Sequence, residues 1–179
     1  SIDRNDGDNA LKTTNPTTSY STTRWNGSPL EEGESVIFQF RLSGADVPDA
    51  FFAGLWASDN NRFEILTLDN PNGSNSVLYA VYGLESSPTY EQLTTLVEDD
   101  AWYVVMLTID STNGNLMRIW KRDAPQVYEE RRIDLDKTGW TFQDLLKGGT
   151  AWIDTGIIGN VYNYSYTDLL VGEESNVWD

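Results

Sequence analysis

A block of alternating residues between positions 102 and 122 constrains the fold of this chain more than any other feature. Every second residue from Tyr103 to Ile109 is apolar, which is the period-2 pattern of a half-buried strand. The pair Asn113-Gly114 then supplies the positive backbone dihedral angles that a tight hairpin turn needs. The strand that follows has two distinct faces, with Met117 and Ile119 on one and Arg118, Trp120 and Arg122 on the other. Together these patterns predict an antiparallel β-hairpin.

Further strands recur at short intervals, with turn signals such as Asn70-Pro-Asn-Gly73 between them. We predict additional strands at 17–25, 35–42, 51–57, 62–68, 77–82, 128–135 and 161–171. The segment 91–97 fits either a short helix or a strand. The segment 140–147 is predicted as one short helical turn, because Gly148-Gly149 provides a helix-ending signal.

The predicted fold class is all-β: an antiparallel two-sheet β-sandwich, or jelly roll, with at most one or two short helices. At 179 residues the chain is long enough for one sizeable core, and no linker or internal repeat divides it. We therefore expect a single domain over residues 1–179, with an acidic lead-in loop at 1–16, the sandwich at 17–172 and a C-terminal tail at 173–179.

Charge and composition restrict the partners of the chain. Its 12 Lys and Arg residues stand against 28 Asp and Glu, which gives a net charge of −16. This charge repels phosphate backbones and anionic lipids, so we expect no nucleic-acid partner and no membrane insertion. Because His and Cys are absent, Ser-His-Asp triads, Cys nucleophiles, His-ligated zinc and disulfides are excluded. The lack of Cys does not by itself fix the compartment: bacterial and phage surface domains commonly do without Cys, whereas small secreted eukaryotic domains often depend on disulfides. Ser1 in place of Met suggests a piece of a longer product.

Two stretches resemble the concanavalin A-like lectin/glucanase superfamily, in particular its laminin-G-like domains and carbohydrate-binding modules. One is the hairpin at 102–120, which opens with Trp-Tyr and carries a Trp in its second strand. The other is the closing segment, in which Tyr166, Asp168 and Gly172 form a Tyr-x-Asp-x-x-x-Gly pattern. The resemblance implies a non-catalytic, glycan-binding module of a larger extracellular protein. The alternative is a structural or adhesive spacer domain of a surface or phage fibre protein.

The resemblance also implies a structural calcium ion. In a number of such modules the late Asp, here Asp168, helps to hold calcium that ties the last strand to the N-terminal segment. In this chain that segment offers Asp3, Asp6 and Asp8. Calcium takes about 6–8 oxygen ligands, which carboxylates, carbonyls and water supply together. The alternative is a solvated acidic tail together with an Asp at the end of a strand.

Aromatic residues are the candidate ligand platforms. Sugar rings expose apolar C–H faces, so their sites pair an aromatic surface with a few polar groups. Trp120 shares a strand face with two arginines, which suits hydroxyl groups or a uronate. The predicted ligand-binding residues are Trp120, Arg118, Arg122, Trp56 and Tyr164. The alternatives are that these aromatic residues belong to the core, and that both arginines pair with Glu130 or Asp134 of the neighbouring strand.

The carboxylates do not form the catalytic run of laminarinase-type glycosidases, which carry Glu-x-Asp-x-x-Glu or Glu-x-Asp-x-Glu on one strand. Glu64 and Asp69 point to opposite faces of their strand. Glu130 and Asp134 share a face but lie about 13 Å apart at the rise of a strand. Polysaccharide lyases of the superfamily generally use a Tyr with a His or Gln and an Arg; His is absent here, whereas Gln and Tyr are present. We therefore predict no enzyme activity, and a polysaccharide hydrolase or lyase is the less favoured alternative.

Overall fold

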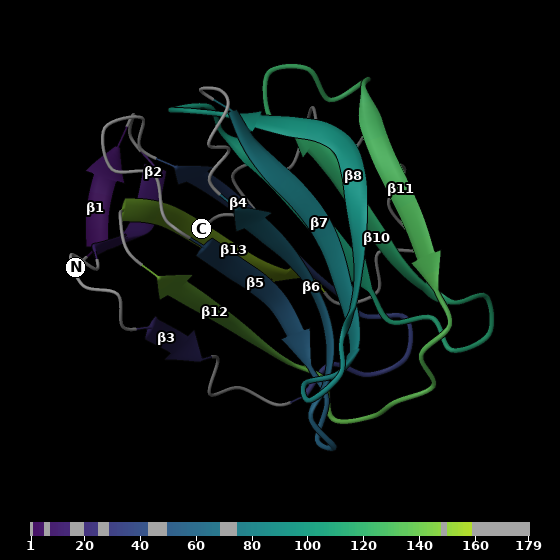
Figure 1. Cartoon of the computed structure of the whole chain (residues 1–179). Helices are drawn as coiled ribbons and strands as arrows, with labels where there is room; N and C mark the ends of the chain where they lie inside the picture. Colours follow the sequence, from purple (N-terminus) through teal and green to yellow (C-terminus); the bar gives the residue numbers. More distant parts are fainter. Residues whose placement is uncertain are drawn as a thin grey trace.

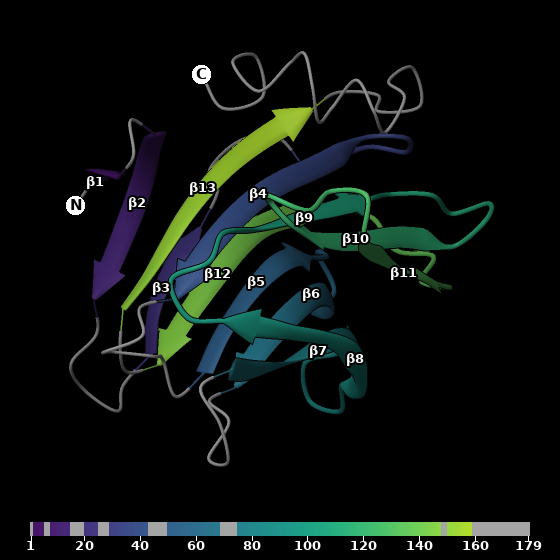
Figure 2. The ribbon, with the colours of Figure 1, turned by 90° about the horizontal axis from the view of Figure 1, so that it is seen from above.

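The chain folds into two antiparallel β-sheets that lie face to face (Figures 1 and 2). The structure, a computed structural model, describes residues 2–5, 8–14, 20–24, 29–42, 50–68, 75–147 and 150–158. The seven-stranded sheet has the order β1 (Ile2–Asn5), β2 (Asp8–Thr14), β13 (Thr150–Ile158), β4 (Ser35–Leu42), β9 (Tyr103–Thr108), β10 (Asn115–Lys121) and β11 (Tyr128–Ile133). The six-stranded sheet has the order β3 (Tyr20–Arg24), β12 (Thr141–Lys147), β5 (Ala50–Trp56), β6 (Asn61–Leu68), β7 (Asn75–Leu84) and β8 (Thr89–Glu98). This arrangement confirms the predicted β-sandwich.

The core lies between the two sheets and is built by every second residue of the central strands. Phe38 of β4 packs against Phe142 of β12, with ring centroids 5.2 Å apart. Phe40 packs between Phe51 of β5 at 5.4 Å and Tyr103 of β9 at 5.8 Å. All five rings are buried. Because β4 and β9 belong to one sheet and β5 and β12 to the other, these contacts hold the sheets together.

The predicted hairpin is present as β9 and β10, which pair in antiparallel register. Met117 and Ile119 enter the core, whereas Arg118 lies on the opposite face, as the alternation predicts. Gly114 has a φ of 87°. Asn113 does not adopt a positive φ, because the connection spans residues 109–114 and is wider than a two-residue turn. Its backbone N–H instead donates to Asp110 Oδ1 at 2.9 Å.

Two segments differ from the sequence-based expectation, and a third, which the sequence left open between helix and strand, is a strand. Residues 140–147, predicted as a helical turn, contain β12, because Trp140 and Phe142, two residues apart, both enter the core, as they do on a strand. The ambiguous segment 91–97 lies within β8. Residues 1–16, predicted as a lead-in loop, contain β1 and β2, and β2 gains backbone hydrogen-bond partners by pairing with β13.

The predicted last strand at 161–171 lies outside the described residues, and β13 was not predicted. The described part of the chain contains no helix of the length and apolarity needed to cross a membrane.

Glu129 of β11 links the edge strands of the two sheets. Its carboxylate accepts hydrogen bonds from the backbone N–H groups of Thr94 and Thr95 on β8, each at 3.0 Å, and from both of their hydroxyl groups. Nη2 of Arg131 donates to it at 2.7 Å. Partial burial alone would raise the pKa of Glu129, but the N–H and O–H donors of Thr94 and Thr95 outweigh burial and lower it.

We expect Glu129→Ala to lower the free energy of unfolding by about 2 kcal/mol, because two backbone N–H groups of β8 lose their acceptor. Glu129→Gln keeps one acceptor oxygen and should lower it less. Because the folded-state pKa is depressed, the contribution of the carboxylate is complete above the unfolded-state pKa and is lost as the pH falls through the folded-state pKa. Denaturant unfolding at a series of acidic pH values measures both effects. An Ala variant with wild-type stability at neutral pH would contradict this role.

Candidate functional site

The outer face of the six-stranded sheet, which points away from the other sheet, carries a group of aromatic side chains. Phe52 and Trp56 of β5 alternate with residues that enter the core. The strand register places Tyr79 of β7 and Tyr90 of β8 on the same side. Tyr90 is 50% exposed, and the other three are partly exposed. We call Phe52, Trp56, Tyr79 and Tyr90 the aromatic face.

Two residues of β6 fix the orientation of Trp56. Its indole N–H donates to Glu64 Oε2 at 3.0 Å, and the guanidinium of Arg62 lies over its ring, 4.5 Å from the centroid. The same guanidinium lies 5.7 Å from the ring centroid of Phe52, and its Nη1 is 3.3 Å from Glu64 Oε1. Arg62 and Glu64 share a face because they alternate along one strand. The aromatic face is therefore organised around a held cation.

Glu64 is a buried acid outside the core, with an exposed fraction of 0%. Burial raises its pKa to about 7, although the charge of Arg62 and the hydrogen bond from Trp56 both lower it. Glu85, whose Oε1 lies 3.6 Å from Nη2 of Arg62, raises this pKa slightly further. Strongly shifted pKa values are concentrated at functional sites. Because Glu64 is inaccessible, its role is to position Trp56 and Arg62 and not to contact a ligand.

Gly54 makes this arrangement of β5 and β6 possible. It stands between Phe52 and Trp56 on the same face and pairs with Glu64 across the two strands. Its φ is 156°, a conformation that only glycine adopts without strain. A Cβ at this position would lie 2.5 Å from the Cα and Cβ of Glu64. The absence of a side chain at Gly54 therefore lets Glu64 pack beneath the aromatic face.

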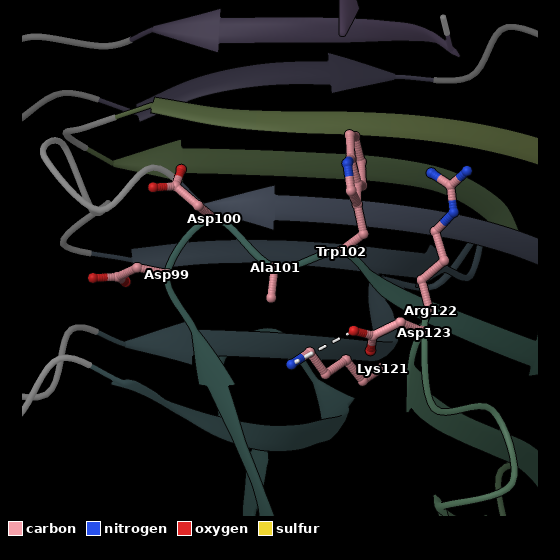
Figure 3. A pocket seen from close by; sticks show the side chains of 7 residues that line it. All are labelled: Asp99, Asp100, Ala101, Trp102, Lys121, Arg122 and Asp123. Carbon is pink, nitrogen blue, oxygen red and sulfur yellow. Dashed lines mark ion pairs between the residues drawn. The ribbon is translucent and has the colours of Figure 1, made fainter. Parts of the chain in front are cut away.

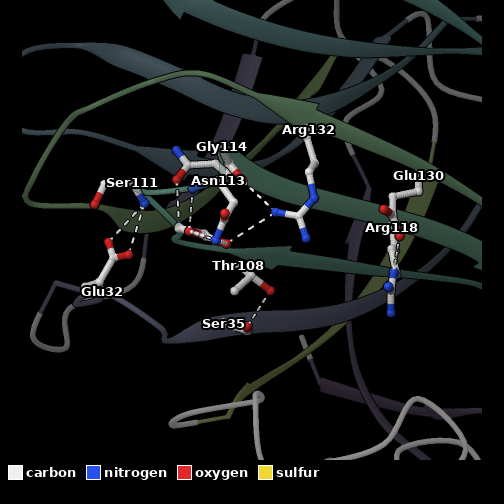
Figure 4. Close-up of polar contacts among 11 residues, drawn as sticks. Glu32, Ser35, Thr108, Ser111, Asn113, Gly114, Arg118, Glu130 and Arg132 are labelled. Carbon is white, nitrogen blue, oxygen red and sulfur yellow. Dashed lines mark hydrogen bonds and ion pairs between the residues drawn. The ribbon is translucent and has the colours of Figure 1, made fainter.

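Two of the predicted ligand-binding residues, Arg118 and Trp120, lie on the outer face of the other sheet. Trp120 is only 3% exposed, which does not fit the predicted role of an open stacking platform. Arg118 donates from Nε to Glu130 Oε2 at 2.6 Å (Figure 4), because the register of β10 and β11 places the two residues opposite each other. The alternative in which this arginine pairs with Glu130 is confirmed.

The polar groups at the β9–β10 connection satisfy one another (Figure 4). The backbone N–H of Asp110 donates to Asn115 Oδ1 at 2.9 Å, and its carboxylate accepts from Nη1 of Arg132 at 3.2 Å. Nearby, the hydroxyl groups of Ser35 and Thr108 share a hydrogen bond at 2.7 Å. These contacts stabilise the hairpin and its attachment to β4 and β11.

Of the other predicted ligand-binding residues, Trp56 lies on the aromatic face and Arg122 lies elsewhere, beside a cavity at the end of β10 (Figure 3). Tyr164 lies outside the described residues. The structure therefore does not bring the five residues together. The strand register and burial explain this result, because Trp56 belongs to one sheet and Trp120 to the other.

The calcium site stays a prediction. Asp3 lies on β1 and Asp8 on β2, which pair antiparallel. Asp6 and Asp168 lie outside the described residues. Within the described ranges, no group of three or more acidic side chains is placed to hold a metal ion.

Sequence reasoning missed Arg62 and Glu64. One signal in the sequence could have identified them. Trp56 is followed by a short turn at 57–60 and then by Arg62 and Glu64, which is the pattern of a hairpin. A hairpin at this point predicts that Trp56 and Arg62 face each other, which the register confirms. The sequence places Glu64 near one other acid of its strand, Asp69, but does not show that Glu64 is buried.

Comparison with solved structures identifies the fold. Galectin-Ib of Xenopus laevis matches with a TM-score of 0.54 at 12% sequence identity, over 76% of this chain and 99% of the galectin. Endo-β-1,4-glucuronan lyase of the fungus Trichoderma reesei matches with a TM-score of 0.53 at 16% identity, over 85% of this chain and 82% of the lyase. A toad ovary galectin in complex with thio-digalactose matches with a TM-score of 0.51 at 11% identity, over 78% of this chain and 99% of the galectin.

The chain therefore has the concanavalin A-like lectin/glucanase fold, as the sequence resemblance implies. At these low identities the likeness concerns the fold alone. No protein-family model matches the sequence, and a comparison with curated proteins finds no significant match.

Proposed function

We propose that this protein is a non-catalytic carbohydrate-binding domain that binds a glycan on the aromatic face. The observation that carries the proposal is the held ring of Trp56, fixed by Glu64 and Arg62 beside Phe52 on the outer face of a sheet. A ring held in this way loses little conformational freedom when a sugar stacks on it. Gln92, which is exposed and pairs with Tyr79, adds a polar group that can bind hydroxyl groups on the same face.

The structural neighbours support a sugar as the first ligand to test. The toad ovary galectin is in complex with thio-digalactose, and congerin II, which matches with a TM-score of 0.52 at 10% identity, is liganded with lactose. These proteins share the fold of this chain, and their ligands guide the choice of probe.

We expect Trp56→Ala to weaken glycan binding about tenfold or more, because a desolvated aromatic anchor contributes about 1–3 kcal/mol. A glycan array identifies the ligand, and calorimetric titration compares the variants. Tyr128→Ala is the matched control, because Tyr128 is an exposed aromatic residue on the other sheet. If a folded Trp56→Ala variant binds the glycan with the affinity of the wild type, the aromatic face is not the binding site.

A binding domain must also be distinguished from an enzyme, since a glucuronan lyase shares the fold. Glu64 has a pKa suited to proton transfer, but it is inaccessible and bonded to Trp56 and Arg62. A proton donor or acceptor must reach the substrate to act. We therefore infer that the domain binds without cleaving. Incubation of the pure protein with neutral and uronate polysaccharides should release no new reducing ends and no unsaturated products.

We also propose a setting and a metal for this domain. It would belong to a larger extracellular or surface protein of a bacterium or phage, and a calcium ion would tie Asp168 to the N-terminal segment. The placement of Asp3 and Asp8 on adjacent strands supports this proposal. A structural or adhesive spacer remains the alternative, and it would give no response on a glycan array.

Calcium removal should lower the melting temperature by several degrees, since an ion that binds only the folded state stabilises it by mass action. The measurement compares thermal unfolding in chelator and in millimolar calcium. Asp168→Ala should abolish the difference, whereas Asp134→Ala, a substitution at an exposed acid of another segment, should retain it. Identical melting curves of the wild type with and without calcium would contradict the proposal.

A further inference from the structure

A cavity of about 550 Å³ lies where the connection between β8 and β9 meets the end of β10 (Figure 3). Its walls include Asp100 and Trp102 from the connection, and Lys121, Arg122 and Asp123 from the end of β10. Cavities of this size commonly hold small ligands. None of these residues belongs to the aromatic face, so the cavity is a separate place on the molecule.

The backbone around the cavity is fixed by hydrogen bonds. The N–H of Arg122 donates to the carbonyl oxygen of Trp102 at 2.9 Å, and the N–H of Asp100 donates to that of Leu42 at 2.8 Å. Asp100 has a φ of 60°, a conformation that Asp and Asn tolerate better than most residues. Because both sides of the cavity are tied to strand ends, the cavity exists before a ligand arrives, which reduces the entropy cost of binding.

The chemistry of the walls combines an aromatic ring with hydrogen-bonding groups. In Figure 3 the side chains of Asp100, Trp102 and Arg122 project in the same direction, with the indole between the carboxylate and the guanidinium. The indole N–H of Trp102 is buried and has no acceptor among the described residues. Buried donors without an acceptor are uncommon in folded proteins, so this one favours an acceptor that a ligand supplies.

The charges of the cavity indicate which ligands it accepts. Nζ of Lys121 is 3.1 Å from Glu98 and 4.0 Å from Asp123, so this cation is already engaged by acids. The carboxylates of Asp100 and Asp123 are exposed. An anionic ligand would meet these carboxylates in a chain of net charge −16. The guanidinium of Arg41 lies over one face of the Trp102 indole, 5.5 Å from the ring centroid. A neutral sugar residue presents hydroxyl donors to the carboxylates, oxygen acceptors to the N–H groups, and a C–H surface to the other face of the indole.

We propose that this cavity is a second saccharide site, specific for neutral sugar residues, and that the domain holds a neutral polysaccharide at two separate places. The proposal rests on the proposed carbohydrate-binding function but involves none of the residues of the aromatic face. Two sites on one domain would bind a long chain more tightly than either site alone, where the chain can reach both.

The test uses calorimetry and two-dimensional amide NMR with the neutral disaccharides lactose, cellobiose and maltose. For the disaccharide that binds, the wild type should show two sites, and Trp56→Ala should keep the cavity site. Asp100→Asn and Trp102→Ala should weaken the cavity site about tenfold and leave the aromatic face unchanged. Asp100→Asn is the decisive variant if Trp102→Ala unfolds, because Asn keeps the size and backbone preference of Asp. Asp134→Asn, an exposed site away from the cavity, is the control.

The outcomes separate this proposal from the proposed function. If Asp100→Asn and folded Trp102→Ala bind as the wild type does while Trp56→Ala loses binding, the cavity is not a site and the aromatic face stands. If Trp56→Ala binds as the wild type does while Asp100→Asn and folded Trp102→Ala lose binding, the cavity is the site and the aromatic face is not. A digalacturonate that shifts the amide signals of residues 99–102 as strongly as the neutral disaccharides do would contradict the specificity. A wild type that binds none of the three would overturn the cavity proposal, and the aromatic face would then be tested with the ligand that the glycan array identifies.

Discussion

Gly54→Ala should destabilise the domain by more than about 4 kcal/mol, a loss comparable with the whole stability of many domains. The added Cβ would lie 2.5 Å from Glu64 Cα and 2.6 Å from the carbonyl oxygen of Phe63. Both atoms belong to the backbone of the central strand β6, so they cannot move aside without breaking the ladder between β5 and β6. The φ of 156° at Gly54 adds strain for any residue with a side chain.

Gly83→Ala is the matched control for this substitution. Gly83 also has a positive φ, 97°, but a Cβ there would meet no atom closer than 3.9 Å. We expect a cost of about 1–2 kcal/mol for backbone strain alone. Thermal and denaturant unfolding gives the loss of unfolding free energy for each variant. The loss for Gly83→Ala reports backbone strain, and the additional loss for Gly54→Ala reports the steric contact. If Gly54→Ala unfolds at the same denaturant concentration as Gly83→Ala, the backbone of β6 does not lie as close to Gly54 as the structure shows.

Glu64→Gln should make the domain more stable than the wild type, and the difference should grow with pH. The pKa of Glu64 is about 7 in the folded chain and has an ordinary value of 4.5, so the folded state holds the proton more tightly than the unfolded state. The stability that this proton provides is complete below the unfolded-state pKa and is lost as the pH rises through about 7. As the pH rises from about 4.5 to above about 7, the free energy of unfolding of the wild type should fall by about 3 kcal/mol relative to that of the variant.

Denaturant unfolding of both proteins from mildly acidic to mildly alkaline pH measures this difference. Gln can still accept the indole N–H of Trp56, so the positions of the neighbouring side chains are kept. Glu85→Gln is the control, because it removes a charge beside Arg62 but from a half-exposed group, where water screens the effect. If the difference in unfolding free energy between Glu64→Gln and wild type does not change with pH, the pKa of Glu64 is not raised in the folded chain. The buried position of its carboxyl group would then be wrong.

The fold could be predicted to a large extent from short-range patterns. Alternation from Tyr103 to Ile109 and at Met117 and Ile119 identified the central hairpin, because burial on one face imposes a period of two. The same rule indicates a strand at β12, because Trp140, Phe142 and Leu146 stand at even-numbered positions and all enter the core. The Gly148-Gly149 pair misled the prediction there, since glycines end strands as well as helices. Which strands join which sheet could not be predicted, because it depends on contacts between distant residues.

The candidate site was predictable only in part. Trp56 was a predicted ligand-binding residue, and the structure places it on the aromatic face. Trp120 and Arg118 carry similar sequence signals, yet one is buried and the other is paired with Glu130. The difference between these cases lies in what covers or faces each residue across strands, and a single strand's sequence does not contain that information. The raised pKa of Glu64 is missing from the sequence for the same reason, because it results from burial.

The most direct test of a glycan site on the aromatic face is an amide NMR titration of the wild type with the oligosaccharide that binds best on the array. We expect the indole N–H signal of Trp56 and the backbone signals of β5 and β6 to shift and saturate together. Shifts at residues 99–102 would add the cavity site without affecting this conclusion. A bound oligosaccharide that shifts only the signals of β9, β10 and β11, and leaves Trp56 unchanged, would contradict it.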